Sequence, residues 1–72
     1  MEEYIFTFGS GQELEGFCVR IKGKDYYDCR RKMLEKFGEE WSFQYSLKEW
    51  TDWTIKAKEY CIPVEEEILV IE

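Results

Sequence analysis

The three cysteines have the most reactive side chains in this sequence. Cys18, Cys29 and Cys61 are widely spaced, none belongs to a Cys-x-x-Cys motif, and the chain contains no histidine. A structural zinc site needs a fourth ligand and closer spacing, and a cysteine or serine nucleophile normally relies on a neighbouring base such as histidine. We therefore expect reduced thiols that pack or lie at the surface, with no metal, no cofactor and no enzymatic activity.

Two further patterns could carry chemistry but have simpler explanations. The sequence Gly9-Ser10-Gly11 resembles part of a phosphate-binding loop, yet such a loop leads directly into a helix, and here a strand pattern follows. We interpret it as a connector. Carboxylates are plentiful, but no pair stands out by its spacing, so solvation of the surface explains nearly all of them.

The charge is unevenly distributed along the chain. Residues 20–36 contain seven basic and three acidic residues, a balance of +4, and the remainder contains three basic and thirteen acidic residues, a balance of −10, which together give the net charge of −6. Ordinary helix design places bases toward the negative end of the helix dipole and explains part of this pattern. The alternative is a pair of oppositely charged surfaces that steer a partner.

Two sets of residues are therefore candidates for binding. The first is acidic and aromatic, and tryptophan is common in interface hot spots; it would face a basic protein and comprises Glu39, Glu40, Glu49, Trp50, Asp52, Trp53, Glu65, Glu66 and Glu67. Packing in the core is the competing explanation for the two tryptophans. The second set is basic, would bind nucleic acid, and comprises Arg20, Lys22, Lys24, Arg31 and Lys32.

The stretch from Asp25 to Tyr45 contains the elements around which these residues are arranged. Asp25 is a favourable N-cap, Gly38 suits the left-handed residue that closes a helix, and the apolar side chains between them recur at helical spacing. That apolar stripe comprises Tyr26, Cys29, Met33 and Phe37, widened by Leu34. Arg30 lies beside the stripe, and we expect its stem to pack while its head reaches a carboxylate or water.

The flanking segments predict strands and a second helix. Residues 3–8, 16–22, 41–46 and 68–71 have strand patterns, and Trp41, Phe43 and Tyr45 should share one face of the third strand. Ser46 and Glu49 form a capping box, so a shorter helix should follow from residue 47 to 57 or 60. The first two strands should form a hairpin with the first strand central. The fold class is α+β: a single domain, residues 1–72, with a mainly antiparallel four-stranded sheet in the order ββαβαβ.

The sequence also bears on the cellular compartment. No apolar run approaches the roughly 18 residues of a membrane span. The first residues, MEEYIFTF, carry acids where a signal peptide carries bases. We expect a cytoplasmic protein that does not bind membranes, and the uniform acidity outside residues 20–36 disfavours nonspecific binding to nucleic acid.

Three segments resemble a known group of proteins. YIFTFGSGQ at residues 4–12, GFCVRIKG at 16–23 and WSFQYS at 41–46 with a downstream tryptophan resemble small uncharacterised proteins of bacteriophages and integrated mobile elements, over Tyr4 to Trp53. The resemblance assigns no activity to any residue. It implies a phage-type accessory protein in the host cytoplasm. Compact acidic proteins of this kind often inhibit host defence, as anti-CRISPR proteins do, and some imitate the charge of DNA and occupy a basic nucleic-acid channel.

We therefore expect a small, acidic, non-enzymatic protein-binding module, an anti-CRISPR-like inhibitor of a host complex that handles nucleic acid. The alternatives are a nucleic-acid-binding module that uses the basic segment and a structural or assembly protein of a phage particle. The fold class alone does not distinguish these three functions.

Overall fold

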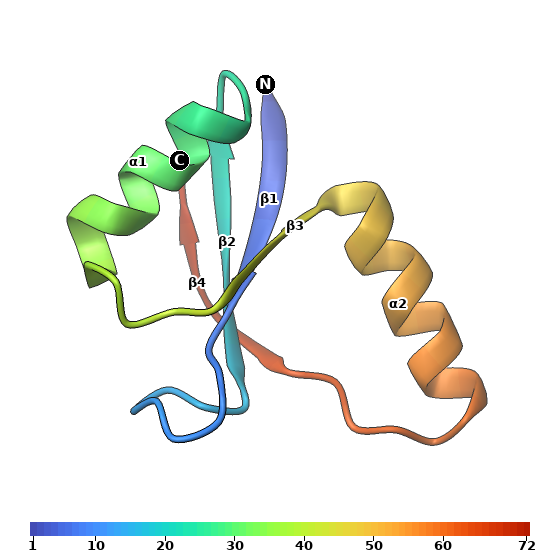
Figure 1. The fold of residues 1–72 in the computed structure, drawn as a ribbon. Coiled ribbons are helices and arrows are strands. Elements are labelled where there is room, and N and C mark those ends of the chain that lie inside the picture. Colours follow the sequence, from blue (N-terminus) through green and yellow to red (C-terminus); the bar gives the residue numbers. More distant parts are fainter.

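A computed structural model describes residues 1–72 and contains one sheet and two helices. The strands are β1 (Glu2–Thr7), β2 (Phe17–Gly23), β3 (Phe43–Ser46) and β4 (Glu66–Ile71), arranged in the order β3-β1-β2-β4 (Figure 1). β1 is antiparallel to β2 and to β3, whereas β2 and β4 pair in parallel. The predicted β1–β2 hairpin and the central position of β1 are confirmed. The sheet is mixed, because two of its three strand pairings are antiparallel and the β2–β4 pairing is parallel.

The parallel pairing of β4 follows from the second helical connection. Helix α1 (Tyr26–Phe37) joins β2 to β3, and helix α2 (Leu47–Glu59) joins β3 to β4. A helical crossover returns the chain in the same direction. β2, β3 and β4 therefore all run the same way, with β1 reversed between β3 and β2. Neither helix is long and apolar enough to cross a membrane.

Helix α1 begins and ends as its sequence predicts. The Asp25 side chain accepts a hydrogen bond from the Asp28 backbone N–H at 2.8 Å, and Gly38, with φ of 63°, donates its N–H to the Leu34 carbonyl. Cys29 and Met33 are fully buried. The buried part of the predicted apolar stripe is smaller than expected, because Tyr26 is 38% exposed and Leu34 is 41% exposed.

Helix α2 starts at the predicted capping box. The Ser46 hydroxyl accepts from the Glu49 N–H, and the Glu49 carboxylate accepts from the Ser46 N–H. The helix has 13 residues against 12 in α1, so the expected shorter second helix was wrong. The helix ends at Glu59, and Cys61, between the helix and Pro63, has a positive φ of 56°.

The two helices cover opposite faces of the sheet (Figure 1). On the α1 face, Cys29 and Met33 pack in one buried cluster with Phe6 of β1, with Val19 and Ile21 of β2, and with Phe8, which directly follows β1. On the α2 face, Trp50 packs with Ile5 and Cys18. β1 therefore contributes side chains to both clusters, which explains why its sequence is apolar at consecutive positions.

The third strand departs from the predicted alternation. β3 starts at Phe43, and Phe43 and Tyr45 lie opposite Thr7 and Ile5 on the α2 face. Trp41 precedes the strand and packs edge-on against Phe6 on the α1 face, with 5.0 Å between ring centroids. The prediction that all three rings share a face was therefore wrong. Strand alternation holds only where the backbone pairs, and residue 41 lies outside the ladder.

Candidate protein-binding surface

Three connecting segments meet at one end of the sheet. β1 ends where β2, β3 and β4 begin, because β1 runs against the other three strands. The segments 8–16, 38–42 and 60–65 therefore lie at that end (Figure 1). Hydrogen bonds from the Ser42 N–H to the Thr7 carbonyl and from the Glu66 N–H to the Gly16 carbonyl connect these segments to their neighbours.

These three segments carry only negative charge. They contain five carboxylates and no lysine or arginine. We call this set the acidic end; it comprises Glu13, Glu15, Glu39, Glu40 and Glu65. None of the five is in an ion pair, whereas many carboxylates elsewhere are paired. The fold thus brings acids that are in no ion pair from distant parts of the sequence to one end of the sheet.

The acidic end is hollowed and partly apolar. One hollow of about 200 Å³ is lined by Phe8, Leu14 and Phe37 with two carboxylates, those of Glu13 and Glu40. A second, of about 320 Å³, also touches Phe8 and is lined by Val64 and the neighbouring proline with the carboxylates of Glu15 and Glu65. Apolar hollows with a charged rim are the pattern of protein interfaces, which have an apolar centre and a polar margin.

The other predicted acids occupy different places. The Glu49 carboxylate is held by the capping box, and its hydrogen bonds from Ser46 lower its pKa. Asp52 accepts from Lys48 Nζ at 3.1 Å on the outer surface of α2. Glu67 lies inside β4 and accepts from Arg20 at 2.7 Å. The last strand was predicted at 68–71, whereas β4 begins at Glu66, so Glu67 lies within the sheet and makes a cross-strand contact.

The two predicted tryptophans support the fold more than the surface. Trp50 is 8% exposed, and its ring lies 5.6 Å from that of Tyr45. Trp53 is half-buried against the same cluster. The most exposed aromatic rings are instead Tyr27, Tyr60 and Phe43, of which only Tyr60 belongs to one of the three segments at the acidic end.

The predicted basic set is divided and largely neutralised within the chain. Arg20 binds Glu3 and Glu67, and Lys22 lies 3.6 Å from Glu72. These contacts leave little free positive charge on β2.

The two predicted bases on α1, Arg31 and Lys32, both lie beside the carboxylate of Asp28. Arg31 pairs with Asp28 and Glu35, and Lys32 lies 3.8 Å from Asp28. The Lys24 backbone N–H and the Arg31 guanidinium lower the pKa of Asp28. Within the predicted set only the Lys24 side chain has no ion pair, so the five residues form no continuous basic surface.

Arg30 is exposed, as expected of a head that reaches water, and it makes a contact that was not predicted. Its guanidinium lies over the Trp41 ring, 4.8 Å from the ring centroid, and it donates to the Tyr26 hydroxyl at 3.4 Å. A cation–π contact of this kind keeps the charge at the surface while the stem packs.

The two buried thiols have raised pKa values, which lower the fraction present as the reactive thiolate. Burial raises the pKa of Cys18 to about 11, helped by the negative charges of Glu67 and Glu65. Burial also raises the pKa of Cys29, whose thiol donates to the Ile21 carbonyl. Cys61 is exposed, all three are free thiols, and no group of three possible metal ligands comes together.

Two members of the acidic end were not predicted. Glu13 and Glu15 lie in the connector between β1 and β2, and sequence reasoning treated that segment as a plain turn. The sequence feature that could have indicated these two residues is the absence of lysine and arginine from all three connectors. That signal becomes meaningful only when the strand directions are known, because they decide which connectors share an end.

Comparisons with known proteins found no matching family model, no matching curated sequence and no matching solved structure.

Proposed function

We propose that the protein is a non-enzymatic binding module whose acidic end contacts a basic surface of another protein. The observation that carries this proposal is the collection of five carboxylates outside any ion pair on three connectors, four of which line two hollows that share Phe8. Clustered carboxylates that are in no ion pair remain available to an external cation; Glu15 accepts only a backbone hydrogen bond, from Gly11. The apolar lining supplies area that a partner can bury.

The net charge of the whole chain supports the same partner class. At −6, the chain attracts a basic surface over a distance of roughly 8–10 Å at ordinary salt. This attraction raises the association rate most, because it acts before contact. The apolar contacts around Phe8 then hold the complex after association.

We further propose that the partner is a host complex that handles nucleic acid, and that binding inhibits it. Proteins of this class carry extended basic surfaces that normally neutralise phosphates, and a cluster of carboxylates is a chemically suitable competitor. The resemblance of residues 4–53 to phage and mobile-element proteins supports a role in countering host defence, as an anti-CRISPR protein does. An assembly role in a phage particle would also use protein contacts, but nothing in the acidic end favours it.

Direct binding of nucleic acid has less support. Phosphate binding depends on free lysine and arginine side chains, and four of the five predicted bases already have carboxylate partners in the chain. A gel shift with short DNA and RNA at low salt tests this alternative. Tight, salt-sensitive binding would support it and contradict the acidic-end proposal.

The proposal itself is tested by capture and competition. The purified protein is used to capture proteins from a bacterial host lysate, and the captured complex is then assayed for nucleic-acid binding with and without the protein. We expect a partner with a basic channel whose nucleic-acid binding falls as the protein is added. A partner that is captured equally well after reversal of Glu40 and Glu65 to lysine would refute the assignment of the site.

A further inference from the structure

β4 is an open edge of the sheet. It pairs with β2 on one side and has no strand on the other. An edge strand presents a row of backbone N–H and C=O groups that another strand can pair with. The apolar residues of β4 are accessible on this edge: Ile68 is 43% exposed and Val70 is 45% exposed.

This edge lacks most of the features that protect natural edge strands. Protection usually comes from lysine, proline, extreme shortness, a bulge or a covering element. β4 has six residues and contains neither lysine nor proline. Its register with β2 shifts between Cys18 and Val19, so that Ile68 is the extra residue of a bulge, and residues 69–71 then pair regularly.

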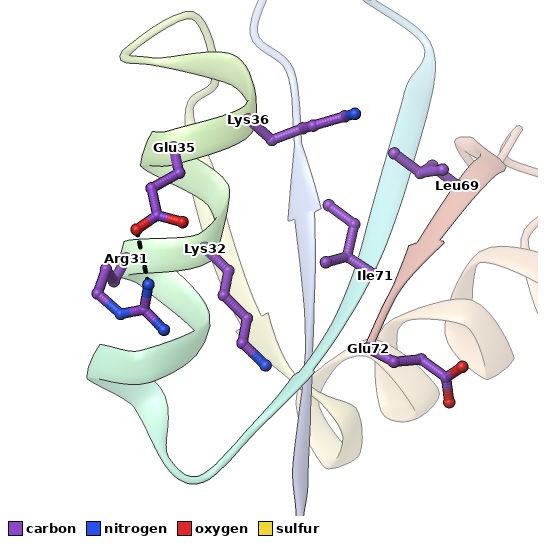
Figure 2. Close-up of a pocket in the computed structure, with 7 residues that line it drawn as sticks. All are labelled: Arg31, Lys32, Glu35, Lys36, Leu69, Ile71 and Glu72. Carbon is purple, nitrogen blue, oxygen red and sulfur yellow. Dashed lines mark hydrogen bonds and ion pairs between the residues drawn. The ribbon is translucent and has the colours of Figure 1, made fainter.

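A groove runs beside the same edge, between β4 and α1. Its volume is about 410 Å³, and Leu69 and Ile71 form its apolar part. Figure 2 shows the opposite wall, made by side chains of α1. Lys36 projects from α1 toward β4 in this view, and it has no ion pair in the chain. A strand added beside β4 would place alternate side chains over this groove.

The charges along β4 identify the chemistry of the occupant. Glu66 begins β4 and has no ion pair, and Glu72 follows its last residue, where it is 78% exposed and lies 3.6 Å from Lys22. A strand that carries a lysine or arginine at each end and apolar residues between them would place opposite charges level with these carboxylates. Such cross-strand pairs favour one partner and one register.

A second copy of this chain fits the edge poorly. If two copies paired antiparallel over the whole of Glu66–Ile71, Glu65 of each copy would lie opposite Glu72 of the other. Like charges directly opposite each other destabilise a strand pair, and each copy carries a net charge of −6. The charge pattern therefore favours a basic partner over self-association.

We propose that β4 is a strand-addition site, at which an extended segment of a basic partner protein pairs with the open edge and places apolar side chains in the groove over Leu69 and Ile71. The inference rests on the proposed function, because it names how the same basic partner is held. The acidic end adjoins the site through Glu65, which directly precedes β4. Strand addition is a recurring mode of peptide recognition, with backbone hydrogen bonds for affinity and side-chain pockets for specificity.

The test uses short synthetic peptides and amide hydrogen exchange of the intact protein. The probe peptide has lysine at both ends and valine at alternate positions between them. A matched peptide has the same sequence with alternate backbone amides N-methylated, which removes donors on one edge without changing charge. We expect the probe to slow exchange of amides in residues 67–71 by about tenfold or more, and the methylated peptide to have no such effect.

A variant pair tests the location. Val70→Lys places a like charge beside the peptide lysines and should weaken binding by roughly two- to fivefold. Ile55→Lys is the matched control, since Ile55 is 63% exposed on α2 and the change in net charge is the same. We expect Ile55→Lys to bind like the unchanged protein.

Three outcomes overturn the strand-addition site. The first is equal binding of both peptides that depends on Glu40 and Glu65, which would leave the acidic end as a purely electrostatic site. The second is no change in β4 exchange at millimolar probe. The third is slowed β4 exchange on concentrating the protein alone, with a dimer by sedimentation, which would make a second copy the occupant. The capture experiment judges the acidic end separately in each case.

Discussion

Replacing Arg20 tests how β4 is held to the sheet. From β2, Arg20 donates through Nε to Glu67 Oε1 at 2.7 Å and through Nη1 to Glu3 Oε1 at 3.3 Å, so it links three strands. The side chains are partly exposed, at 27% for Arg20, 39% for Glu67 and 28% for Glu3. Hydrogen bonding to Glu67 and the nearby carboxylates raise the pKa of Arg20, so the guanidinium stays charged at neutral pH.

Arg20→Met keeps most of the aliphatic stem and removes both ion pairs. A partly exposed ion pair contributes about 0.2–1 kcal/mol, so loss of the two should lower the free energy of unfolding by about 0.5–2 kcal/mol. The carboxylates left behind still reach water and therefore add little further cost. Urea unfolding measures the loss, and added salt should reduce it.

Lys22→Met is the matched control, because the Lys22–Glu72 pair is longer, at 3.6 Å, and Glu72 is 78% exposed. We expect its effect to stay below about 0.5 kcal/mol. Amide exchange should accelerate in β4 for Arg20→Met more than in β1. A loss above about 3 kcal/mol would indicate a buried network. No loss, with unchanged exchange in β4, would show that Arg20 does not hold the strand.

Three further predictions concern the core, the capping box and the thiols. Met33→Ala should cost about 2–5 kcal/mol in a chemical melt because Met33 is fully buried, and a loss below 1 kcal/mol would contradict the packing. Ser46→Ala should cost about 1 kcal/mol and reduce helicity by circular dichroism; an unchanged helix would refute the capping role. Iodoacetamide at mildly alkaline pH should modify Cys61 first, since only thiolates react. Cys18 titrates near pH 11 against 9.0 unperturbed, so stability should fall as pH rises across that interval; equal labelling of all three thiols would contradict this burial.

The helix ends and the hairpin were predictable because their signals are local. Asp25, Gly38 and the Ser46–Glu49 box each act within four residues, and the structure places all of them as expected. The parallel pairing of β4 was not predictable, since it depends on where a long crossover returns. The same limit applied to Trp41, whose partner Phe6 is distant in sequence.

The candidate site was predicted in part for the same reason. Glu39, Glu40 and Glu65 were named from the charge balance, but Glu49 and Glu67 were named with them although their carboxylates serve a cap and a cross-strand pair. Net charge along the chain cannot distinguish a free carboxylate from a partnered one. That distinction requires the positions of the bases, which the sheet order determines.

The central claim is that the acidic end is the surface that meets the partner, and two charge-matched double variants test it directly. Glu40→Lys with Glu65→Lys reverses one acid in each hollow, whereas Asp52→Lys with Glu59→Lys makes the same change in net charge on α2. Surface plasmon resonance with the captured partner at two salt concentrations measures the association rate. We predict slower association and a flatter salt dependence for the first variant alone, because electrostatic steering depends on where the charge lies. Equal effects in both variants would mean that only net charge matters, and that result would contradict the site.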